Sequence, residues 1–566
     1  MQPEHPVTDP SQAAAAGRLA PGAFEALFES VNRSDAPGLV VGVSHRGRVL
    51  FRRGYGMACV ALGVSNTPAT RMRIGSTTKH FTCLAALLLA EDGLLDIDAP
   101  VRDHLPELPD LGADPTLRQL MTHTSGVRCY LDLHLLAGGL AVRPVGDVLR
   151  NQLRQSSLNF APGEDILYCN GGYQLLSEVI ARTAGMAFER VLRERIFEPM
   201  GMHDTESLPD DLTLHRGLAT LHLPRPGGGY ERGIFPTRET RGEGAMVSTV
   251  DDMLKWLAHL RRPTVVGSAS TWRQMLQTTR LRNGLPIPYA LGLMRHDHRG
   301  VEVVHHAGGV IGGCSQMLTV PAHELDIVMM LNGAPLNPMD LAYRIIERVL
   351  GPEVLGPEGR KVPAERFRPL VGARYRDRAS RMVIEFSDQA GQLALTACNL
   401  MPVPLHDTGE SIRLGFEDMA AMPIECATTD LPAAGDAAPE SLAVKLGGNL
   451  RLLDKLPEPP PPNRIAGVAL AGRYRSADLA VDAEVTLDGE TLTMRVQGDA
   501  PAVRYQLQAL DADVFAWEML DLPGPPMKGL LDVHREGGAV RGFHLQTSRT
   551  RQLWFARLGG AGRDNG

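Results

Sequence analysis

The chain has 566 residues, a formal net charge of −7 at pH 7 and 43% hydrophobic residues. This length is too great for one core and indicates about three or four domains. Charges of both signs are mixed without a run of Lys or Arg, which argues against nucleic acid or an anionic membrane as a partner. No apolar stretch reaches the length of a membrane span, so no membrane partner is expected.

The N-terminal segment is acidic and Pro-rich ahead of the alanine run Ala13 to Ala16. It lacks a basic start and an apolar core, so we expect a disordered tail over residues 1–21 and not a secretory signal. The seven cysteines form an odd set without a Cys-x-x-Cys pair, which is typical of reduced thiols in a cytoplasmic protein. The histidines show no metal-binding spacing, so we predict no metal and no other cofactor.

The first candidate site lies at the start of a predicted helix. Gly75-Ser76-Thr77-Thr78-Lys79 precedes an apolar run that is closed by Gly93, the pattern of a buried helix with Gly just past its end. Residues three apart share a helix face, so the Lys79 amine can reach the Ser76 hydroxyl, and the helix dipole favours loss of a proton from either group. A serine nucleophile with a neutral lysine as its base is one interpretation; a simple helix N-cap is the other.

Two further clusters could complete this site. Tyr168-Cys169-Asn170 follows a Pro-Gly turn and leads into an apolar helix. The Tyr168 hydroxyl could relay a proton to the serine and the Asn170 amide could bind the substrate carbonyl, or the two could be a loop tyrosine and a helix cap. His306-Ala307-Gly308-Gly309 precedes two strand-like runs. Bare glycines on a strand let another backbone, such as that of a substrate, approach closely.

The C-terminal third predicts small β domains. Residues 351–365 and 456–464 are turn-rich linkers, the second with a Pro run. Around them, short alternating apolar runs bounded by Gly or Asp indicate antiparallel barrels or sandwiches. Leu370-Val371-Gly372-Ala373-Arg374-Tyr375-Arg376 recurs as Leu470-Ala471-Gly472-Arg473-Tyr474-Arg475. We therefore predict two copies of one β domain, at 366–455 and 465–558.

The order and spacing of Ser-x-x-Lys, Tyr-x-Asn and His-x-Gly resembles the penicillin-recognising serine hydrolases, which include class C β-lactamases, D,D-peptidases, esterases and D-aminopeptidases. The resemblance covers residues 22–350. It implies a multi-domain α+β chain whose catalytic domain has a β-lactamase/transpeptidase-like fold, with an antiparallel sheet flanked by helices and an all-helical lobe. Two tail domains are similar to the D-aminopeptidase branch (peptidase S12), which implies lipocalin-like barrels and a homodimer.

The resemblance also implies roles for individual residues. Ser76 would attack the substrate, Lys79 and Tyr168 would move the proton, and His306 would supply polarity where relatives carry lysine. The substrate would be bound by Asn170 and by the strand residues Gly308 and Gly309, and the N–H groups of Ser76 and Gly309 would form an oxyanion hole.

In the D-aminopeptidase branch a loop from the last barrel reaches the catalytic cleft. The candidate here is the segment 517–527, in which Asp521 would bind the ammonium of the substrate, because a buried ammonium needs a carboxylate. Other acids close in sequence that could serve instead are Glu518, Asp511 and Asp513.

The function that the resemblance implies is a serine aminopeptidase. It would remove N-terminal D-residues, preferably small ones such as D-Ala, from peptides, amides and esters through an acyl-enzyme on Ser76. Histidine at the third motif weakens the case for binding a substrate carboxylate and favours an aminopeptidase or esterase over a β-lactamase. Two alternatives stay open: a carboxylesterase or β-lactamase/D,D-peptidase of the same fold, and a non-catalytic protein whose barrels hold an apolar ligand.

Overall fold

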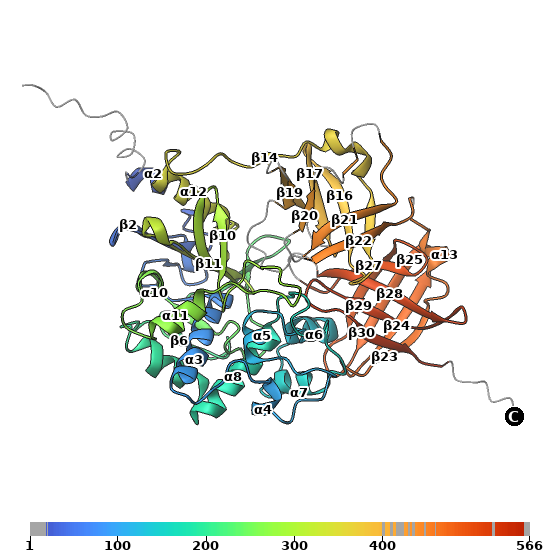
Figure 1. Cartoon of the computed structure of the whole chain (residues 1–566), viewed down its shortest axis with the longest axis horizontal. Coiled ribbons are helices and arrows are strands. Elements are labelled where there is room, and N and C mark those ends of the chain that lie inside the picture. The colour runs from blue at the N-terminus through green and yellow to red at the C-terminus, as the bar shows by residue number, and fades with distance from the viewer. Residues whose placement is uncertain are drawn as a thin grey trace, which may run out of the picture.

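The computed structural model describes residue 19 and residues 21–398, 402–407, 411–414, 424–427, 431–432, 436–446, 449–458, 460–522 and 527–559. Of the predicted N-terminal tail, residues 1–18 and 20 lie outside this description. A sheet and a group of helices make up the N-terminal part, and the two β domains lie together beside them (Figure 1).

The N-terminal part, residues 21–350, carries the predicted catalytic motifs and is called the catalytic part below. It is built on one six-stranded antiparallel sheet in the order β10-β11-β12-β13-β1-β2. Two of its interior strands, β13 and β1, are buried almost throughout because helices cover both faces of the sheet. Helix α10 packs on one face and α12 on the other. The strands are β1 (Leu39–His45), β2 (Arg48–Tyr55), β10 (Met294–His298), β11 (Val301–Val310), β12 (Gly313–Val320) and β13 (Leu325–Leu331).

Helix α3 (Lys79–Glu91) is the centre of the helical lobe. All of its residues from Lys79 to Leu89 are buried, and α8, α9 and α11 pack around it. The remaining helices of this part are α2 (Pro21–Glu25), α4 (Val101–His104), α5 (Leu117–Met121), α6 (Tyr130–Gly138), α7 (Asp147–Leu153), α8 (Asn170–Ala184), α9 (Phe188–Leu192), α10 (Val250–Arg261), α11 (Ala269–Leu276) and α12 (Pro338–Leu350).

The N-terminal part also contains several short elements. Four are one-turn or slightly longer helical segments: η1 (Glu29–Val31), η2 (Gly75–Thr78), η3 (Arg193–Phe197) and η4 (Pro321–His323). Three small sheets pair β3 with β4, β7 with β8, and β9 with both β5 and β6. Their strands are β3 (Met57–Cys59), β4 (Val64–Ser65), β5 (Met72–Arg73), β6 (Glu206–Ser207), β7 (His222–Pro224), β8 (Tyr230–Arg232) and β9 (Met246–Ser248).

The first β domain is a nine-stranded sheet in the order β14-β18-β17-β16-β15-β22-β21-β20-β19. Strand β18 also pairs with β19, so the strands from β18 to β19 form a ring and β14 lies outside it. The elements are β14 (Arg360–Lys361), η5 (Ala364–Leu370), β15 (Arg374–Asp377), β16 (Val383–Gln389), β17 (Gln392–Ala397), β18 (Val403–Asp407), β19 (Ser411–Leu414), β20 (Ile424–Ala427), β21 (Ser441–Leu446) and β22 (Asn449–Lys455).

The second β domain is a closed barrel that runs from β23 to β30 in chain order. Tyr474 is fully buried in its first strand, as Tyr375 is in β15 of the first domain. The sequence repeat therefore marks the same core position in both domains. The elements are α13 (Asn463–Ala466), β23 (Gly472–Ser476), β24 (Val481–Asp488), β25 (Thr491–Gln497), β26 (Val503–Ala509), β27 (Val514–Met519), β28 (Lys528–Glu536), β29 (Ala539–Gln546) and β30 (Leu553–Arg557).

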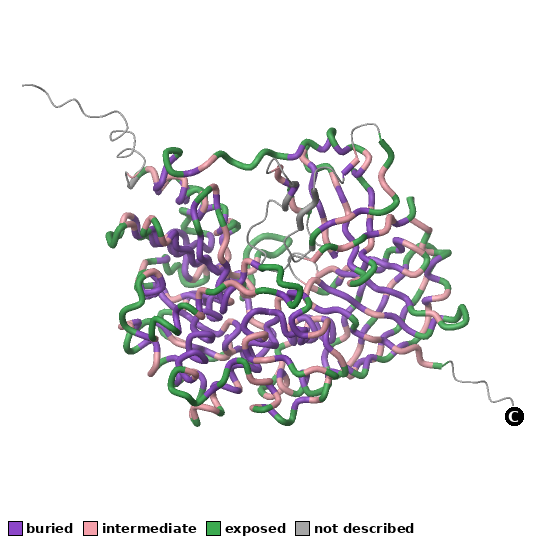
Figure 2. Tube along the Cα trace, viewed as in Figure 1, coloured by how far each residue is buried: buried purple, intermediate pink, exposed green. Residues whose placement is uncertain are grey.

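Helix α6 joins the catalytic part to the second barrel. Leu133, Leu136 and Ala137 of this helix belong to the same buried cluster as the barrel core, and the Tyr505 hydroxyl donates to the Leu136 carbonyl at 2.6 Å. Buried residues accordingly continue from the helical lobe into the barrel strands (Figure 2). The two β domains also contact each other, where Arg376 pairs with Asp532 at 2.6 Å.

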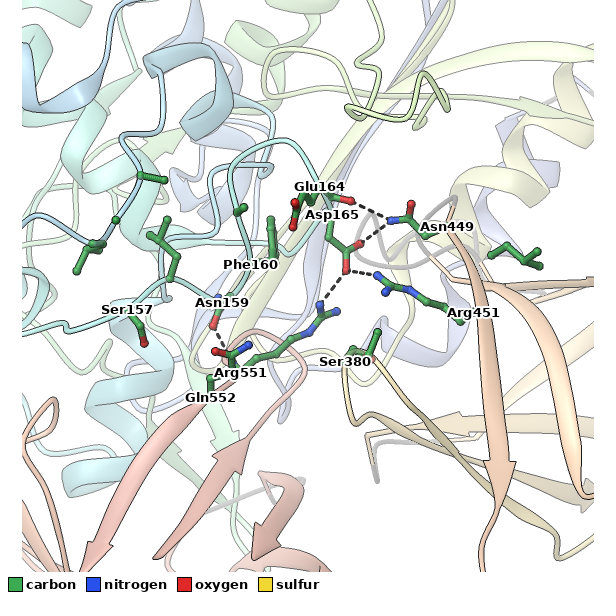
Figure 3. A pocket seen from close by; sticks show the side chains of 17 residues that line it. Ser157, Asn159, Phe160, Glu164, Asp165, Ser380, Asn449, Arg451, Arg551 and Gln552 are labelled. Atoms are coloured by element: carbon green, nitrogen blue, oxygen red, sulfur yellow. Dashed lines mark hydrogen bonds and ion pairs between the residues drawn. The ribbon is translucent and has the colours of Figure 1, made fainter. Parts of the chain in front are cut away.

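Asp165 lies where all three parts meet. Its Oδ2 accepts from Arg451 of the first β domain at 2.9 Å and from Arg551 of the second at 2.8 Å, and both pairs line a pocket of about 620 Å³ (Figure 3). The Asp165 side chain is only 6% exposed. One buried carboxylate therefore fixes both β domains to the loop that precedes Tyr168.

We expect Asp165→Asn to lower the melting temperature clearly, because two poorly solvated guanidinium groups lose their counter-charge. The corresponding destabilisation is about 3 kcal/mol. Asp98→Asn is the control: Asp98 pairs with Arg118 but is 60% exposed, so its loss should cost under about 1 kcal/mol. Scanning calorimetry compares the two variants, and equally small shifts would contradict the role assigned to Asp165.

Candidate active site

Ser76 and Lys79 lie together where η2 passes into α3. The amine of Lys79 donates to Ser76 Oγ at 3.0 Å. Ser76 is partly exposed, whereas Lys79 is fully buried. A hydroxyl that faces solvent beside a buried amine is the arrangement of an activated nucleophile and its base.

The surroundings of Lys79 favour its neutral form. Burial lowers the pKa of the amine to about 7, against the opposing effect of Glu243, and the charge of Arg549 lowers it further. Besides Ser76, the amine donates to Asn170 Oδ1 at 3.0 Å and to the Glu243 carbonyl at 2.8 Å. In its protonated form the amine donates to all three oxygens. When it is neutral, the Asn170 and Glu243 oxygens, which can only accept, take both of its hydrogens, and its lone pair then accepts from the Ser76 hydroxyl.

Asn170 and Tyr168 come from the start of α8. Asn170 is the first residue of this helix, whose N-cap, Cys169, accepts from the Gly172 N–H through its sulfur at 3.3 Å. Lys79 Nζ lies 4.7 Å from the centroid of the Tyr168 ring. The structure thus brings the Tyr-x-Asn motif to the Ser-x-x-Lys motif. The buried Cys169 thiol has a capping role, and burial raises its pKa, which disfavours the thiolate.

The glycines of β11 lie against η2. A Cβ on Gly308 would be 1.9 Å from the Ile74 carbonyl oxygen, and a Cβ on Gly75 would be 2.8 Å from the backbone nitrogen of Gly309. The backbone that Gly308 admits is therefore the protein's own, beside the nucleophile. Gly309 is exposed, with open space at its Cβ position. The peptide of Gly309 thus adjoins that of Gly75 and Ser76, as an oxyanion hole requires.

His306 is part of a hydrogen-bonded chain that crosses the site. Its Nε2 lies 3.2 Å from the Tyr289 hydroxyl, which lies 3.1 Å from His123 Nε2. His123 Nδ1 accepts from the Cys169 N–H at 3.0 Å, so its Nε2 carries the hydrogen that reaches Tyr289. Tyr289 then donates to His306, whose Nδ1 donates to the Ala307 carbonyl.

Both histidines in this hydrogen-bonded chain, His306 and His123, are therefore neutral. Burial lowers the pKa of His306 to about 3, and it lowers that of His123 well below its ordinary value. The ring of His123 also lies 4.1 Å from that of Tyr168, centroid to centroid. His306 does not carry the positive charge of a lysine. The chain holds the Tyr-x-Asn segment in place relative to β11.

Glu243 is a buried residue in contact with Lys79. Its carboxylate accepts from the Tyr130 hydroxyl and from the Arg241 N–H at 3.1 Å, and burial raises its pKa. It lies outside the three motifs on which the family resemblance rests.

A loop of the second barrel, residues 547–552 between β29 and β30, lies at the site. Cζ of Arg549 is 4.9 Å from the centroid of the Tyr168 ring. The predicted loop was a different one, 517–527, of which residues 523–526 lie outside the described residues. Asp521 is bound to Arg504 of its own barrel, with Oδ2 accepting from the Arg504 N–H at 2.7 Å and Oδ1 from Nη2 at 2.7 Å.

Three of these contributions had no usable signal in the sequence. Tyr289 and His123 lie outside the three motifs, and Arg549 lies in a short polar turn far from them. In the part of the chain that the structure describes, no group of His, Cys, Asp or Glu could hold a metal ion. No described helix is long and apolar enough to cross a bilayer.

Comparisons with known proteins agree with this geometry. The Beta-lactamase family model matches residues 24–350. A D-aminopeptidase of Brucella melitensis is 27% identical over 94% of this chain and 98% of its own length. A D-aminopeptidase of Gluconobacter oxydans is 30% identical over 53% of this chain and 56% of its own. The octameric penicillin-binding protein homologue from Pyrococcus abyssi shares the fold, with a TM-score of 0.52 and 19% identity over 94% of this chain and 99% of its own.

We expect Gly308→Ala to lower the melting temperature and Gly309→Ala to leave it nearly unchanged. The added methyl group at 308 would clash with the Ile74 carbonyl and with Ser315 Oγ, whereas nothing lies within 4 Å of the same group at 309. Overpacking of this kind costs about 1–3 kcal/mol. Thermal unfolding of the two variants tests the contact, and similar melting temperatures would show that β11 does not press on η2.

Proposed function

Because the chain belongs to the Beta-lactamase family, we propose that it is a serine aminopeptidase that releases N-terminal D-residues, preferably small ones, from peptides, amides and esters. The observation that carries the proposal is the neutral lysine at 3.0 Å from the serine hydroxyl. The near full-length likeness to a D-aminopeptidase supports the substrate class.

In the proposed reaction Ser76 Oγ attacks the carbonyl carbon of the N-terminal residue while its proton passes to Lys79. The N–H groups of Ser76 and Gly309 stabilise the oxyanion. The C–N bond then breaks, and the leaving amine takes the proton through Lys79 and Tyr168. Water attacks the resulting ester, which releases the D-amino acid and restores the Ser76 hydroxyl.

Asn170 has two functions in this scheme. Its Oδ1 accepts from Lys79, and its Nδ2 makes no hydrogen bond with any residue that the structure describes. That donor is available for the substrate carbonyl. His306 acts through Tyr289 as a positioning residue and does not take part in proton transfer.

We keep Asp521 as the candidate partner of the substrate ammonium. Its bond to Arg504 is an exposed one, with the arginine side chain 65% exposed. Exposed pairs of this kind contribute only about 0–1 kcal/mol, so exchange of Arg504 for a substrate ammonium is energetically accessible. A homodimer, a cytoplasmic location and lipocalin-like character of both β domains remain predictions; light scattering tests the first.

The purified protein should hydrolyse the p-nitroanilide of D-Ala, but not those of L-Ala or N-acetyl-D-Ala. Ser76→Ala should reduce this activity by roughly 10³-fold or more because the acyl-enzyme cannot form. Ser65→Ala, an exposed serine on β4, is the control and should keep wild-type rates. Rapid hydrolysis of p-nitrophenyl esters without any anilide turnover would favour the carboxylesterase instead.

The pH dependence of kcat/KM should report the ionisation of Lys79. Burial lowers its pKa to about 7, so the amine is protonated and inactive below that pH and neutral above it. We expect kcat/KM for D-Ala p-nitroanilide to rise through about pH 7 and to fall again above about pH 8, where the α-ammonium of the free substrate loses its proton. If the rise occurred only near the ordinary lysine pKa, Lys79 would not be the buried base.

A further inference from the structure

The loop that carries Arg549 is anchored on both sides. On one side, Thr547 Oγ1 donates to the carboxylate of Asp132 on α6. On the other, the Arg551 N–H donates to Asn159 Oδ1 at 2.7 Å, and the Arg551 guanidinium pairs with Asp165 at 2.8 Å (Figure 3). The position of Arg549 is therefore set by the contact between the barrel and the catalytic part.

The turn itself is stabilised from within. Thr547 Oγ1 accepts from the N–H groups of Arg549 and Thr550, each at 2.9 Å, and the Thr547 N–H donates to the Thr550 carbonyl at 2.8 Å. A hydroxyl that accepts from the backbone two and three residues on holds a tight turn. The Arg549 side chain thus projects from a fixed point of the backbone.

Only the backbone of Arg549 forms hydrogen bonds with the residues that the structure describes. Among these residues no carboxylate forms an ion pair with its guanidinium, and the nearby Asp132 is engaged by Thr547. The side chain is partly exposed and lies over the Tyr168 ring. The charge of Asp132 acts on Arg549 from nearby, but a guanidinium that donates to no carboxylate keeps its five N–H donors available for an anion.

Arg549 lies close to the reacting groups. Both Arg549 Cζ and Lys79 Nζ lie against the same ring, at 4.9 Å and 4.7 Å from its centroid. In the proposed reaction Tyr168 returns the proton to the leaving amine, so a group stacked on Tyr168 is placed near the leaving residue.

We propose that Arg549 binds the free carboxylate of the leaving residue, and that the site therefore prefers short peptides with an unblocked C-terminus, above all dipeptides. This inference rests on the proposed function. It also revises the argument from the sequence that histidine at the third motif weakens the case for binding a substrate carboxylate. His306 is neutral and offers no counter-charge for a carboxylate on β11, but the barrel loop brings a permanent cation to the site. A carboxylate and a guanidinium match in a bidentate geometry.

The test compares D-Ala-Gly, which has a free carboxylate, with D-Ala-glycinamide, in which it is capped. The wild-type protein should have a higher kcat/KM for D-Ala-Gly. Arg549→Gln should lower that value by about 10–100-fold, mainly through KM, as expected for loss of a charged hydrogen bond, and should leave the glycinamide within about threefold. The kcat/KM of Arg549→Lys for D-Ala-Gly should lie between those of the wild type and Arg549→Gln, because lysine keeps the charge but cannot bind a carboxylate in the bidentate geometry of a guanidinium.

Arg495→Gln is the matched control, since Arg495 is exposed on β25 of the same barrel and the charge change is identical. It should leave both substrates unaffected. Equal losses on the free and capped substrates in Arg549→Gln would overturn the proposal and leave Arg549 a support for Tyr168. A preference for D-Glu amide over D-Gln amide that depends on Arg549 would also overturn it, because the carboxylate would then lie on the acyl side.

Calorimetric binding of the two ligands to Ser76→Ala separates this proposal from the proposed function. Tighter binding of D-Ala-Gly that is lost in Ser76→Ala/Arg549→Gln supports the carboxylate site whether or not the wild-type protein turns over. Equal affinities for the free and capped ligands refute it. Absence of Ser76-dependent turnover of any D-aminoacyl substrate would refute the proposed function alone.

Discussion

The buried amine of Lys79 is the group around which the catalytic part is organised. Removing an ammonium from water costs several kcal/mol. Because α3 places the Lys79 amine where no part of the residue reaches solvent, its neutral form is favoured. Its acceptors come from three different segments: η2, α8 and the loop before β9. Any rearrangement of these segments would expose the amine or remove its acceptors, so the requirement for a buried base also holds the three segments together.

The hydrogen-bonded chain through His306, Tyr289 and His123 also holds separate segments of the site together. It joins β11 to the backbone of Cys169, between the two functional residues of the Tyr-x-Asn motif. Each group in it has one proton arrangement that satisfies all of its bonds. The two neutral imidazoles therefore position other groups and carry no charge. The positive charge beside Tyr168 comes from Arg549 of the second barrel.

Much of the site was accessible from sequence because it depends on local geometry. Residues three apart on a helix meet whatever the remaining fold does, which is why Ser76 and Lys79 could be paired. The role of Gly308 could not be deduced, since the backbone it accommodates, at Ile74, is far away in sequence. Arg549 was missed for the same reason: its position depends on contacts with Asp132, Asn159 and Asp165. The two-domain tail was predictable because its repeat marks equivalent core tyrosines, whereas nothing in the sequence indicated that residues 547–552 reach the site.

The pairing of β1 with β13 and the late position of Arg549 in the chain also affect the order of events during synthesis. The central sheet cannot close until Leu325–Leu331 has left the ribosome, because β1 hydrogen-bonds to that strand. Even then Asp165 lacks Arg451 until the first β domain is made, and it lacks Arg551, as Arg128 lacks Asp478, until the last barrel is made. Domains generally fold as units from the N-terminus during translation. The nascent catalytic part therefore waits with these charges unpaired, and Arg549 reaches the Tyr168 ring only when nearly the whole chain has emerged.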